Sequence, residues 1–190
     1  MLLAITLRDA FAFAGWAPFM REWQILFNRR YNVGIWIIGW LQCAQQIAKI
    51  AGAELAARTS GGTDRRGARL AAVTTLGGVM LGVAGLLAAR PNAALAAIVV
   101  MQVCIGAMGP IAMSWINEEI RAGDRATLLS FNSTGGRLGG VVGLLSGGYM
   151  ADRVGIAAQW KMSGLICLCA AESRTRHYAR LRHVRPDLQT

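Results

Sequence analysis

The sequence is short of charged residues, which make up only 16% of its 190 positions. Soluble domains carry about 25% charged residues, so this chain has too few to cover a water-facing surface. Acidic residues are the scarcest, with 10 Asp and Glu against 20 Lys and Arg. The shortage excludes an ordinary soluble domain, and the mean hydropathy of +0.39 indicates a chain that lies in a membrane.

Residues that bind metals or form disulfides are also few. The sequence has two histidines, both near its C-terminal end, and four cysteines, all within apolar runs: Cys43, Cys104, Cys167 and Cys169. No zinc-ligand spacing and no disulfide framework occur among them. We therefore expect no metal and no cofactor, and we interpret the cysteines as small apolar packing residues.

Catalytic and phosphate-binding patterns are absent as well. The sequence has no pair of carboxylates on a defined scaffold, no Ser/His/Asp set within the apolar runs, and no glycine-rich phosphate loop after a strand. These absences predict that the chain is not an enzyme.

The formal net charge of +10 would suit a nucleic-acid partner. However, the basic residues occur in short clusters between apolar runs and not along one face of a soluble domain. A membrane protein whose cytoplasmic loops are rich in Lys and Arg has the same total charge. We therefore expect no nucleic-acid partner.

Long apolar runs and 23 glycines are what the sequence does contain. Glycine inside apolar runs is typical of transmembrane helices, where it lets backbones approach closely. Each run is near the ~20 residues that cross a bilayer. The runs predict an all-α membrane protein of about six transmembrane helices, at residues 2–20, 33–56, 70–89, 93–116, 127–150 and 154–171, in one unit (1–171) followed by a basic tail (172–190).

The first run is interrupted by Arg8 and Asp9. Adjacent residues do not face each other on a helix, so these two make a poor ion pair. One reading starts the span after them, at about Ala10, and extends it toward Phe27. The other keeps them inside the span and makes Asp9 a proton-titrating carboxylate. We favour the first.

Lys and Arg are unequally distributed between the two sides of the predicted bundle. One side holds eleven, Arg58, Arg65, Arg66, Arg69, Arg121, Arg125, Arg174, Arg176, Arg180, Arg182 and Arg185. The other holds five, Arg21, Arg29, Arg30, Arg90 and Arg153. The positive-inside rule therefore predicts a multi-pass protein of the cell membrane with both termini in the cytoplasm.

The second span carries a polar face. Gln42, Gln45 and Lys49 recur at helical spacing, with Gln46 beside them. Polar groups in hydrocarbon are costly, so this face is expected to turn toward a substrate cavity. The alternative is that the glutamines bond to another helix and that Lys49 reaches the cytoplasmic edge.

The fifth span combines a glycine repeat with an intramembrane cation. Glycine recurs every four residues, which predicts a seam for close helix packing, at Gly135, Gly139, Gly143 and Gly147. Arg137 is two residues from Gly139, about 200° around the helix, so it points away from that seam. Exposure to lipid would cost a few kcal/mol, which favours a water-filled cavity over a buried acidic partner or a side chain that reaches the interface. Asn132 is a weaker candidate for the same cavity.

The sixth span contains Lys161, which follows Trp160. We interpret this pair as an anchor at the outer membrane interface, where Trp and Lys fix helix ends.

Three stretches resemble the major facilitator superfamily, in particular the C-terminal half of a drug-efflux-like member. "DRRGAR" (64–69) is similar to an arginine-rich cytoplasmic loop of the family, "GDRATLLSFNSTGGRLGG" (123–140) to the start of its penultimate helix, and "GGYMADRVGIAAQW" (147–160) to its last outer turn. The loop motif comprises Asp64, Arg65, Arg66 and Arg69. It is either a solvated positive loop or a gating element.

The resemblance implies half of a two-part helical bundle, which transports small molecules by alternating access, with export and proton coupling. The implied partners are the lipid bilayer, a small-molecule substrate and an N-terminal six-helix half, in the same gene or in a separate chain. The alternative function is a non-transporting membrane interaction subunit that packs through its glycine-rich helix.

Overall fold

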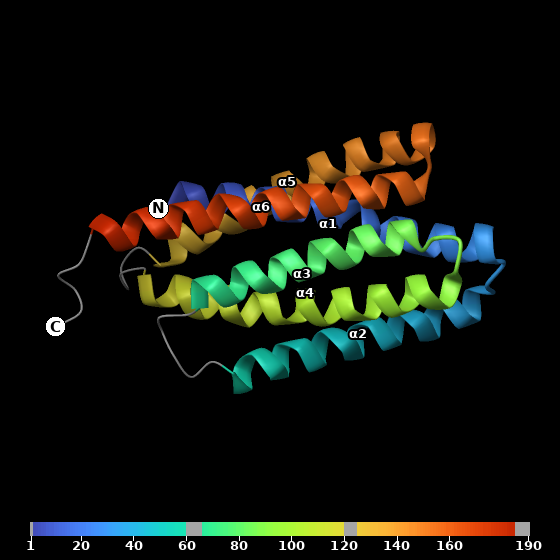
Figure 1. Ribbon diagram of the computed structural model, residues 1–190, viewed down its shortest axis with the longest axis horizontal. Coiled ribbons are helices and arrows are strands. Elements are labelled where there is room, and N and C mark those ends of the chain that lie inside the picture. Colours follow the sequence, from blue (N-terminus) through green and yellow to red (C-terminus); the bar gives the residue numbers. More distant parts are fainter. Residues whose placement is uncertain (1, 60–65, 120–124, 185–190) are drawn as a thin grey trace.

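The computed structural model describes residues 2–59, 66–119 and 125–184, and in these residues it contains six helices. They are α1 (Leu2–Tyr31), α2 (Ile35–Arg58), α3 (Arg66–Leu86), α4 (Pro91–Glu119), α5 (Arg125–Val154) and α6 (Ile156–Val184). The six run back and forth as one elongated bundle, in which α1 begins and α6 ends at the same end (Figure 1). The all-helical prediction is confirmed for the described part of the chain.

The helices extend beyond several predicted spans. Helix α1 runs without a break through Arg8 and Asp9 and continues to Tyr31, past residue 20 and also past Phe27, the end in the favoured interpretation. Helix α6 continues through the start of the predicted basic tail to Val184. The sequence boundaries followed where hydropathy falls, whereas a helix can continue as long as its backbone hydrogen bonds do.

Two helical segments of the described chain are long and apolar enough by composition to cross a membrane, Gly67–Leu86 and Pro91–Ser114. A shorter apolar stretch covers Ile156–Ala171. The remaining helices carry glutamines, glycines or charged residues inside their apolar stretches, which lowers their mean hydropathy. Six membrane spans therefore remain a prediction.

One residue joins α5 to α6. Gly155 adopts a positive φ of +86°, which glycine tolerates better than any residue with a Cβ. Its N–H donates to the Ala151 carbonyl oxygen at 2.9 Å, and its own carbonyl accepts from the Gln159 N–H at 3.1 Å. Gly155 thus ends one helix in a left-handed cap and begins the next.

The main helix contacts form a repeated pattern. Helix α1 packs chiefly on α5 and α6, α4 packs chiefly on α2 and α3, and α3 packs on α6. If α1, α2 and α3 are exchanged with α4, α5 and α6, respectively, the same pairs of helices remain in contact. Such an exchange is typical of a bundle built from two related three-helix units.

The core lies between α1, α3, α4 and α6. Its largest fully buried apolar side chains include Trp23 and Phe19 of α1, Leu81 of α3, Met101 of α4 and Trp160 of α6. Helices α2 and α5 lie along opposite edges of the bundle in Figure 1. They therefore have faces that no other helix of the described chain covers.

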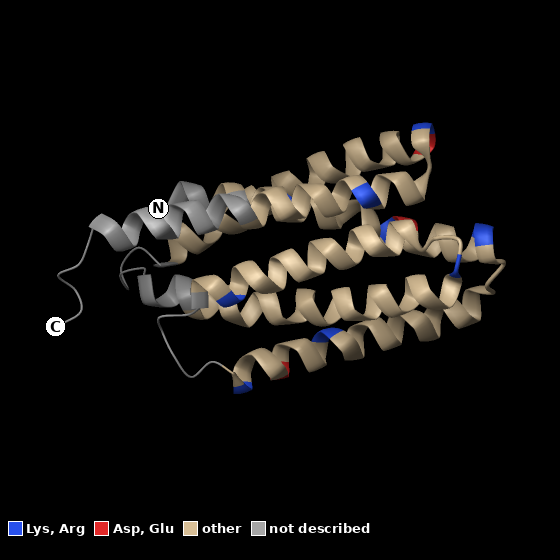
Figure 2. Cartoon of the chain, in the orientation of Figure 1, with Lys and Arg blue, Asp and Glu red and all other residues tan. Residues whose placement is uncertain are grey.

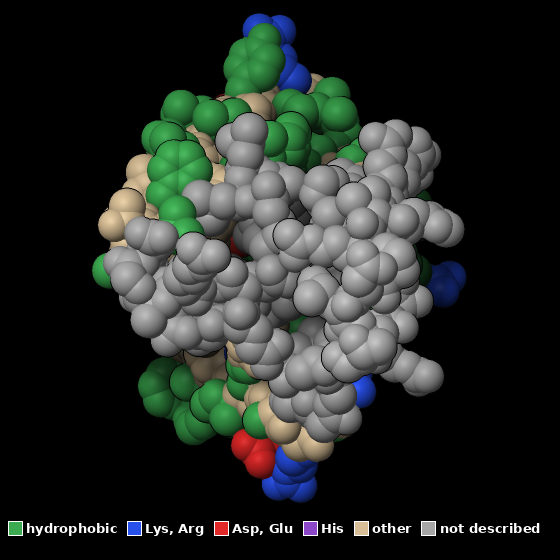
Figure 3. All heavy atoms as spheres, turned by 90° about the vertical axis from the view of Figure 1, so that its left-hand side faces the viewer, with side chains coloured by type: hydrophobic (Ala, Val, Ile, Leu, Met, Phe, Trp, Pro, Cys, Tyr) green, Lys and Arg blue, Asp and Glu red, His purple; other side chains and the backbone are tan. Residues whose placement is uncertain are grey.

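Large apolar side chains occupy those open faces. Trp36 is 77% exposed on α2, and Leu145 is 72% exposed on α5. Hydrophobic side chains also lie on the outward sides in the end view of Figure 3, and most described charged residues lie near helix ends in Figure 2. Soluble monomers rarely expose apolar surface on this scale, so these faces suit lipid or a protein partner.

Candidate functional site

The glycine seam of α5 lies against α1. A Cβ at Gly139 would overlap the Ala10 carbonyl oxygen, and one at Gly143 would overlap the Ala14 carbonyl oxygen. At the two ends of the seam, a Cβ at Gly135 would overlap the Thr6 side chain and one at Gly147 would overlap the Pro18 ring. The two backbones therefore touch directly at Gly139 and Gly143, one helical turn apart, an approach that favours glycine.

Arg137 lies on the face of α5 that points away from α1. The side chain is exposed, as are its neighbours Leu138 and Val141. No carboxylate in the described part of the chain lies within ion-pair distance of Arg137. An acidic partner for this guanidinium, if one exists, therefore lies outside the described contacts of this chain.

Asn132 bonds to α1. Its Nδ2 donates to Asp9 Oδ2 at 2.9 Å, while its own Oδ1 is buried without a hydrogen-bond partner. The contact ties Asp9 to α5, so this carboxylate lies at a helix interface whether or not the membrane span begins after it. Asn132 and Arg137 lie on different sides of α5, because five residues correspond to about 140°.

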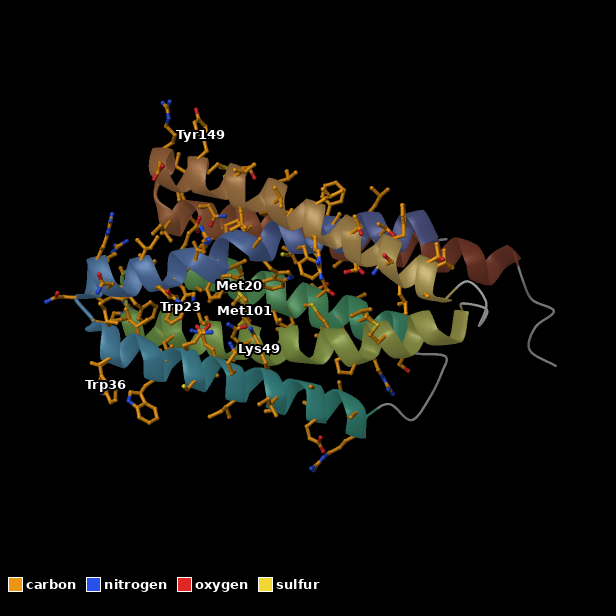
Figure 4. All side chains as sticks on the ribbon, turned by 180° about the vertical axis from the view of Figure 1, so that it is seen from behind. Met20, Trp23, Trp36, Lys49, Met101 and Tyr149 are labelled. Carbon is orange, nitrogen blue, oxygen red and sulfur yellow. The ribbon has the colours of Figure 1, made fainter. Side chains whose placement is uncertain are left out.

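The polar face of α2 is divided between the interior and the surface. Gln45 is 1% exposed and accepts a hydrogen bond from Gln102 Nε2 of α4, which is equally buried. Gln42 and Lys49 are half-buried, and Gln46 is exposed. Gln45 thus bonds across helices, as one of the two sequence-based interpretations proposed, and Figure 4 shows Lys49 on the side of α2 toward the middle of the bundle.

Glycines also bring α2 and α4 together at this polar face. A Cβ at Gly106 of α4 would overlap the Lys49 carbonyl oxygen, and one at Gly52 of α2 would overlap the Val103 carbonyl oxygen. The backbone of Lys49 is therefore fixed against α4 although its side chain is half-exposed. Packing of this kind positions a cation at the border between the core and the open face of the bundle.

The buried amide pair leads to a prediction about stability. Gln102→Leu removes the donor and leaves Gln45 without a partner in an apolar interface, so we expect a loss of about 1–2 kcal/mol in unfolding free energy. The double variant Gln45→Leu/Gln102→Leu should recover most of it, because no unpaired amide remains. Thermal unfolding in detergent measures both, with exposed Gln46→Leu as the control. Equal losses in the single and double variants would contradict a paired role.

The arginine-rich loop motif is only partly described. Asp64 and Arg65 lie outside the described residues, and Arg66 is described only as the first residue of α3. Arg69 Nη1 donates to the Thr59 carbonyl oxygen at the end of α2. A cation bonded to a free carbonyl at a helix C-terminus also interacts favourably with the helix dipole, so Arg69 caps α2.

A buried carboxylate was not identified from the sequence. Glu22 of α1 is 5% exposed, and Trp160 Nε1 of α6 donates to its Oε2 at 3.1 Å. One helical position before Trp160, buried Gln159 donates to Ser163 Oγ at 2.8 Å. The sequence signal was present, since Glu22 is the only acidic residue between Asp9 and Glu54, but its partner is 138 positions away.

The interpretation of Trp160 and Lys161 as an interfacial anchor was wrong for Trp160. That indole is 0% exposed in the core, where its ring centroid lies 5.2 Å from that of Phe19. Lys161 is exposed on the same helix. The two neighbours differ because successive helical positions are about 100° apart, which is enough to turn Lys161 out of the core that Trp160 and Gln159 face.

The cysteines do not all pack in the interior as predicted. Cys104 and Cys167 are buried, and a Cβ at Gly78 would lie 2.9 Å from Cys167 Cβ. Cys43 and Cys169 are exposed, so the packing role holds for only two of the four.

The sequence model of the Major Facilitator Superfamily matches residues 3–172. No curated protein is significantly similar to the chain. Because the family match covers most of the sequence, including most of α1–α6, this chain belongs to the Major Facilitator Superfamily. The chain is therefore a membrane protein of a transporter family and not an enzyme.

Proposed function

We propose that this chain forms the C-terminal half of a secondary transporter that moves small organic molecules by alternating access. The observation that carries the proposal is the family match over residues 3–172, which extends through most of the six-helix bundle. In this arrangement an N-terminal six-helix half, from the same gene or from a separate chain, completes the central cavity. Rocking of one half against the other exposes the cavity to each side of the membrane in turn.

The open faces of α2 and α5 support a missing half. Both helices lie at the edges of the bundle and expose large apolar side chains, and Figure 4 shows Trp36 and Tyr149 pointing outward from them. Arg137 lies among such side chains on α5. A second half over part of this surface would remove Arg137 from lipid and place it beside an aqueous path shared by the two halves. A charged side chain in water has a lower free energy than the same side chain in hydrocarbon.

Export and proton coupling are included in the proposal because of the resemblance at 64–69, 123–140 and 147–160. The candidate residues of the transport path are Arg137 and Asn132 of α5 and Gln42, Gln45 and Lys49 of α2. Gln45 contributes through its bond to Gln102, which fixes α2 on α4. The side chains of Arg137, Gln42 and Lys49 are at least partly accessible.

Reconstitution tests the function. The chain alone, and the chain coexpressed with a six-helix N-terminal half, are placed in liposomes, and uptake of labelled organic cations and anions is measured with and without a pH gradient. We expect flux only from the assembled pair. Absence of flux from both preparations, with correct insertion, would remove the transporter proposal.

We propose six spans with both termini in the cytoplasm, which cysteine labelling tests. In a background without the native cysteines, Thr59→Cys at the end of α2 and Asn92→Cys at the start of α4 place thiols at exposed positions. A membrane-impermeant maleimide should label Asn92→Cys from outside and Thr59→Cys only after the membrane is opened. Labelling of both from the same side would overturn the span count.

The alternative function is a non-transporting interaction subunit that uses the glycine seam. In the folded chain, α1 already covers Gly139 and Gly143 of that seam. A partner helix could reach these glycines only by displacing α1. The observation disfavours this alternative, because the surface on which it depends is used inside the chain.

A further inference from the structure

The strongest unexplained feature of the bundle is a carboxylate inside its aromatic core. Glu22 is 5% exposed, and the indole of Trp160 that donates to its Oε2 is 0% exposed. The other oxygen, Oε1, is buried and has no hydrogen-bond partner. An ionised carboxylate accepts hydrogen bonds at both oxygens, so this site satisfies less than half of what the charged form requires.

Apolar side chains make up the surroundings. Phe19 and Trp23, which flank Glu22 on the same helix, are both at most 1% exposed. The Phe19 ring contacts the Trp160 ring at a tilt of 57°, and Trp23 contacts the Phe27 ring edge-on with centroids 5.9 Å apart. Water therefore has little access to the carboxylate from this side of α1.

No cation neutralises Glu22 among the described residues. On α1 the adjacent cation is Arg21, and on α6 it is Lys161, and both side chains are exposed. No Lys, Arg or His with a described side chain makes an ion pair with Glu22.

The other helices around the core add no charge near this site. Helix α5 has Asp152 and Arg153 at its end, both exposed, and α2 has no charged residue before Lys49. Residues 70–86 of α3 and 91–114 of α4 contain no charged side chain. The titratable Tyr31 hydroxyl at the end of α1 is occupied, since it donates to the Ala88 carbonyl oxygen at 2.6 Å.

These conditions favour a neutral carboxylic acid. A buried charge without a counter-ion is far more costly than a buried neutral group, and a group in such a place takes up a proton instead. In the neutral acid, Oε2 accepts from the Trp160 indole and Oε1 carries the proton. The one-sided hydrogen bonding of Glu22 matches this form better than the ionised one.

We propose that Glu22 is a buried proton-binding site at the contact between α1 and α6, and that it holds its proton in the conformation described. The inference rests in part on the proposed function, because it names Glu22 as the group of this half that carries the coupled proton. Release of the proton requires water or a base to reach Oε1, which is buried in the conformation described. The O–H bond of the acid then breaks and the water or base takes up the proton, so no oxidant or reductant is needed.

Infrared spectroscopy of the chain in lipid nanodiscs tests proton binding without reference to transport. At neutral pH the wild-type chain should show the C=O stretch of a protonated carboxylic acid. Glu22→Gln should remove this band, while Gln keeps an oxygen that accepts from Trp160. Glu22→Asp should keep a band at a shifted frequency, which preserves the test if Glu22→Gln does not fold.

Two controls identify the residue that carries the band. Glu54→Gln removes an exposed carboxylate that is paired with Arg58 at 2.8 Å, and it should leave the band unchanged. Asp9→Asn removes the carboxylate bonded to Asn132 and should also leave it unchanged. A wild-type spectrum without the band, or a band that persists in Glu22→Gln and disappears in Asp9→Asn, would overturn the proposal.

Transport by the assembled pair tests coupling. With Glu22→Gln, uptake driven by a pH gradient should fall at least tenfold, while exchange of labelled for unlabelled substrate continues. Uptake that still follows the pH gradient in Glu22→Gln would overturn the coupling role. If the wild-type pair transports nothing, the proposed function fails, and the infrared band alone decides whether Glu22 binds a proton.

Discussion

Gly139→Leu should abolish the folded bundle. A Cβ at this position would overlap the Ala10 carbonyl oxygen, which belongs to the backbone of α1 and cannot rotate away. Insertion of extra atoms into a packed core costs about 1–3 kcal/mol and more where no side chain can yield. A four-carbon side chain that meets main-chain atoms, with no side chain able to yield, costs more than that range, which is why loss of the fold is expected. The measurement is the yield of monodisperse protein in detergent, together with its thermal unfolding midpoint.

Gly148→Leu is the matched control on the same helix. No heavy atom lies within 4 Å of a Cβ at Gly148, so the substitution tests the helix itself without touching α1. We expect Gly148→Leu to express and unfold as the wild type does. Equal losses of yield and of unfolding midpoint in both variants would indicate that α5 tolerates leucine at neither position. The contact between the seam and α1 would then not explain the effect of Gly139→Leu.

Arg137→Ala should eliminate transport by the assembled pair while expression is unchanged. The exposed guanidinium has no acidic partner in the described chain, so its removal leaves no carboxylate stranded. Loss of an intramembrane charge lowers the cost of insertion by a few kcal/mol, so stability should hold or improve. Uptake of labelled substrate, normalised to the amount of inserted protein, measures the effect.

Arg137→Lys separates charge from shape. A guanidinium binds carboxylates through two parallel hydrogen bonds, whereas an ammonium is a compact point charge, so we expect only partial recovery of transport. A well-expressed Arg137→Ala protein that transports at the wild-type rate would end the cavity hypothesis. Reduced expression that is restored by neutralising an acidic residue of the other half would instead identify Arg137 as a structural ion pair, because breaking a buried pair costs about 3–5 kcal/mol.

Periodic features of the sequence were predictable because they depend on one helix. A four-residue glycine spacing places small residues on one side of α5, and Arg137 must then point elsewhere by helical geometry alone. What the spacing could not specify is the partner. That the glycines meet Ala10 and Ala14 of α1 depends on contacts between residues more than 120 positions apart.

Glu22 and Gln102 were missed for the same physical reason. Glu22 stands between Arg21 and Trp23, just past residue 20 where the first apolar run ends, and extending that span toward Phe27 did not distinguish Glu22 from its neighbours. Its carboxylate becomes buried because α1 continues to Tyr31 and because α6 packs beside it, so that the Trp160 indole donates a hydrogen bond to it. Single-helix patterns identify which residue is polar, but burial is a property of the assembled bundle.

Direct backbone contacts hold several helix pairs of this bundle together, which leaves the side chains on its outer faces free to vary. Gly139 on Ala10, Gly143 on Ala14 and Gly106 on Lys49 make contacts through main-chain atoms, which do not depend on the side chains of the outer faces. Side chains on the open faces of α2 and α5 can therefore be exchanged without moving the helices that carry them. Single substitutions on these faces should therefore change what the faces contact, lipid or a protein partner, largely independently of the seam contacts inside the bundle.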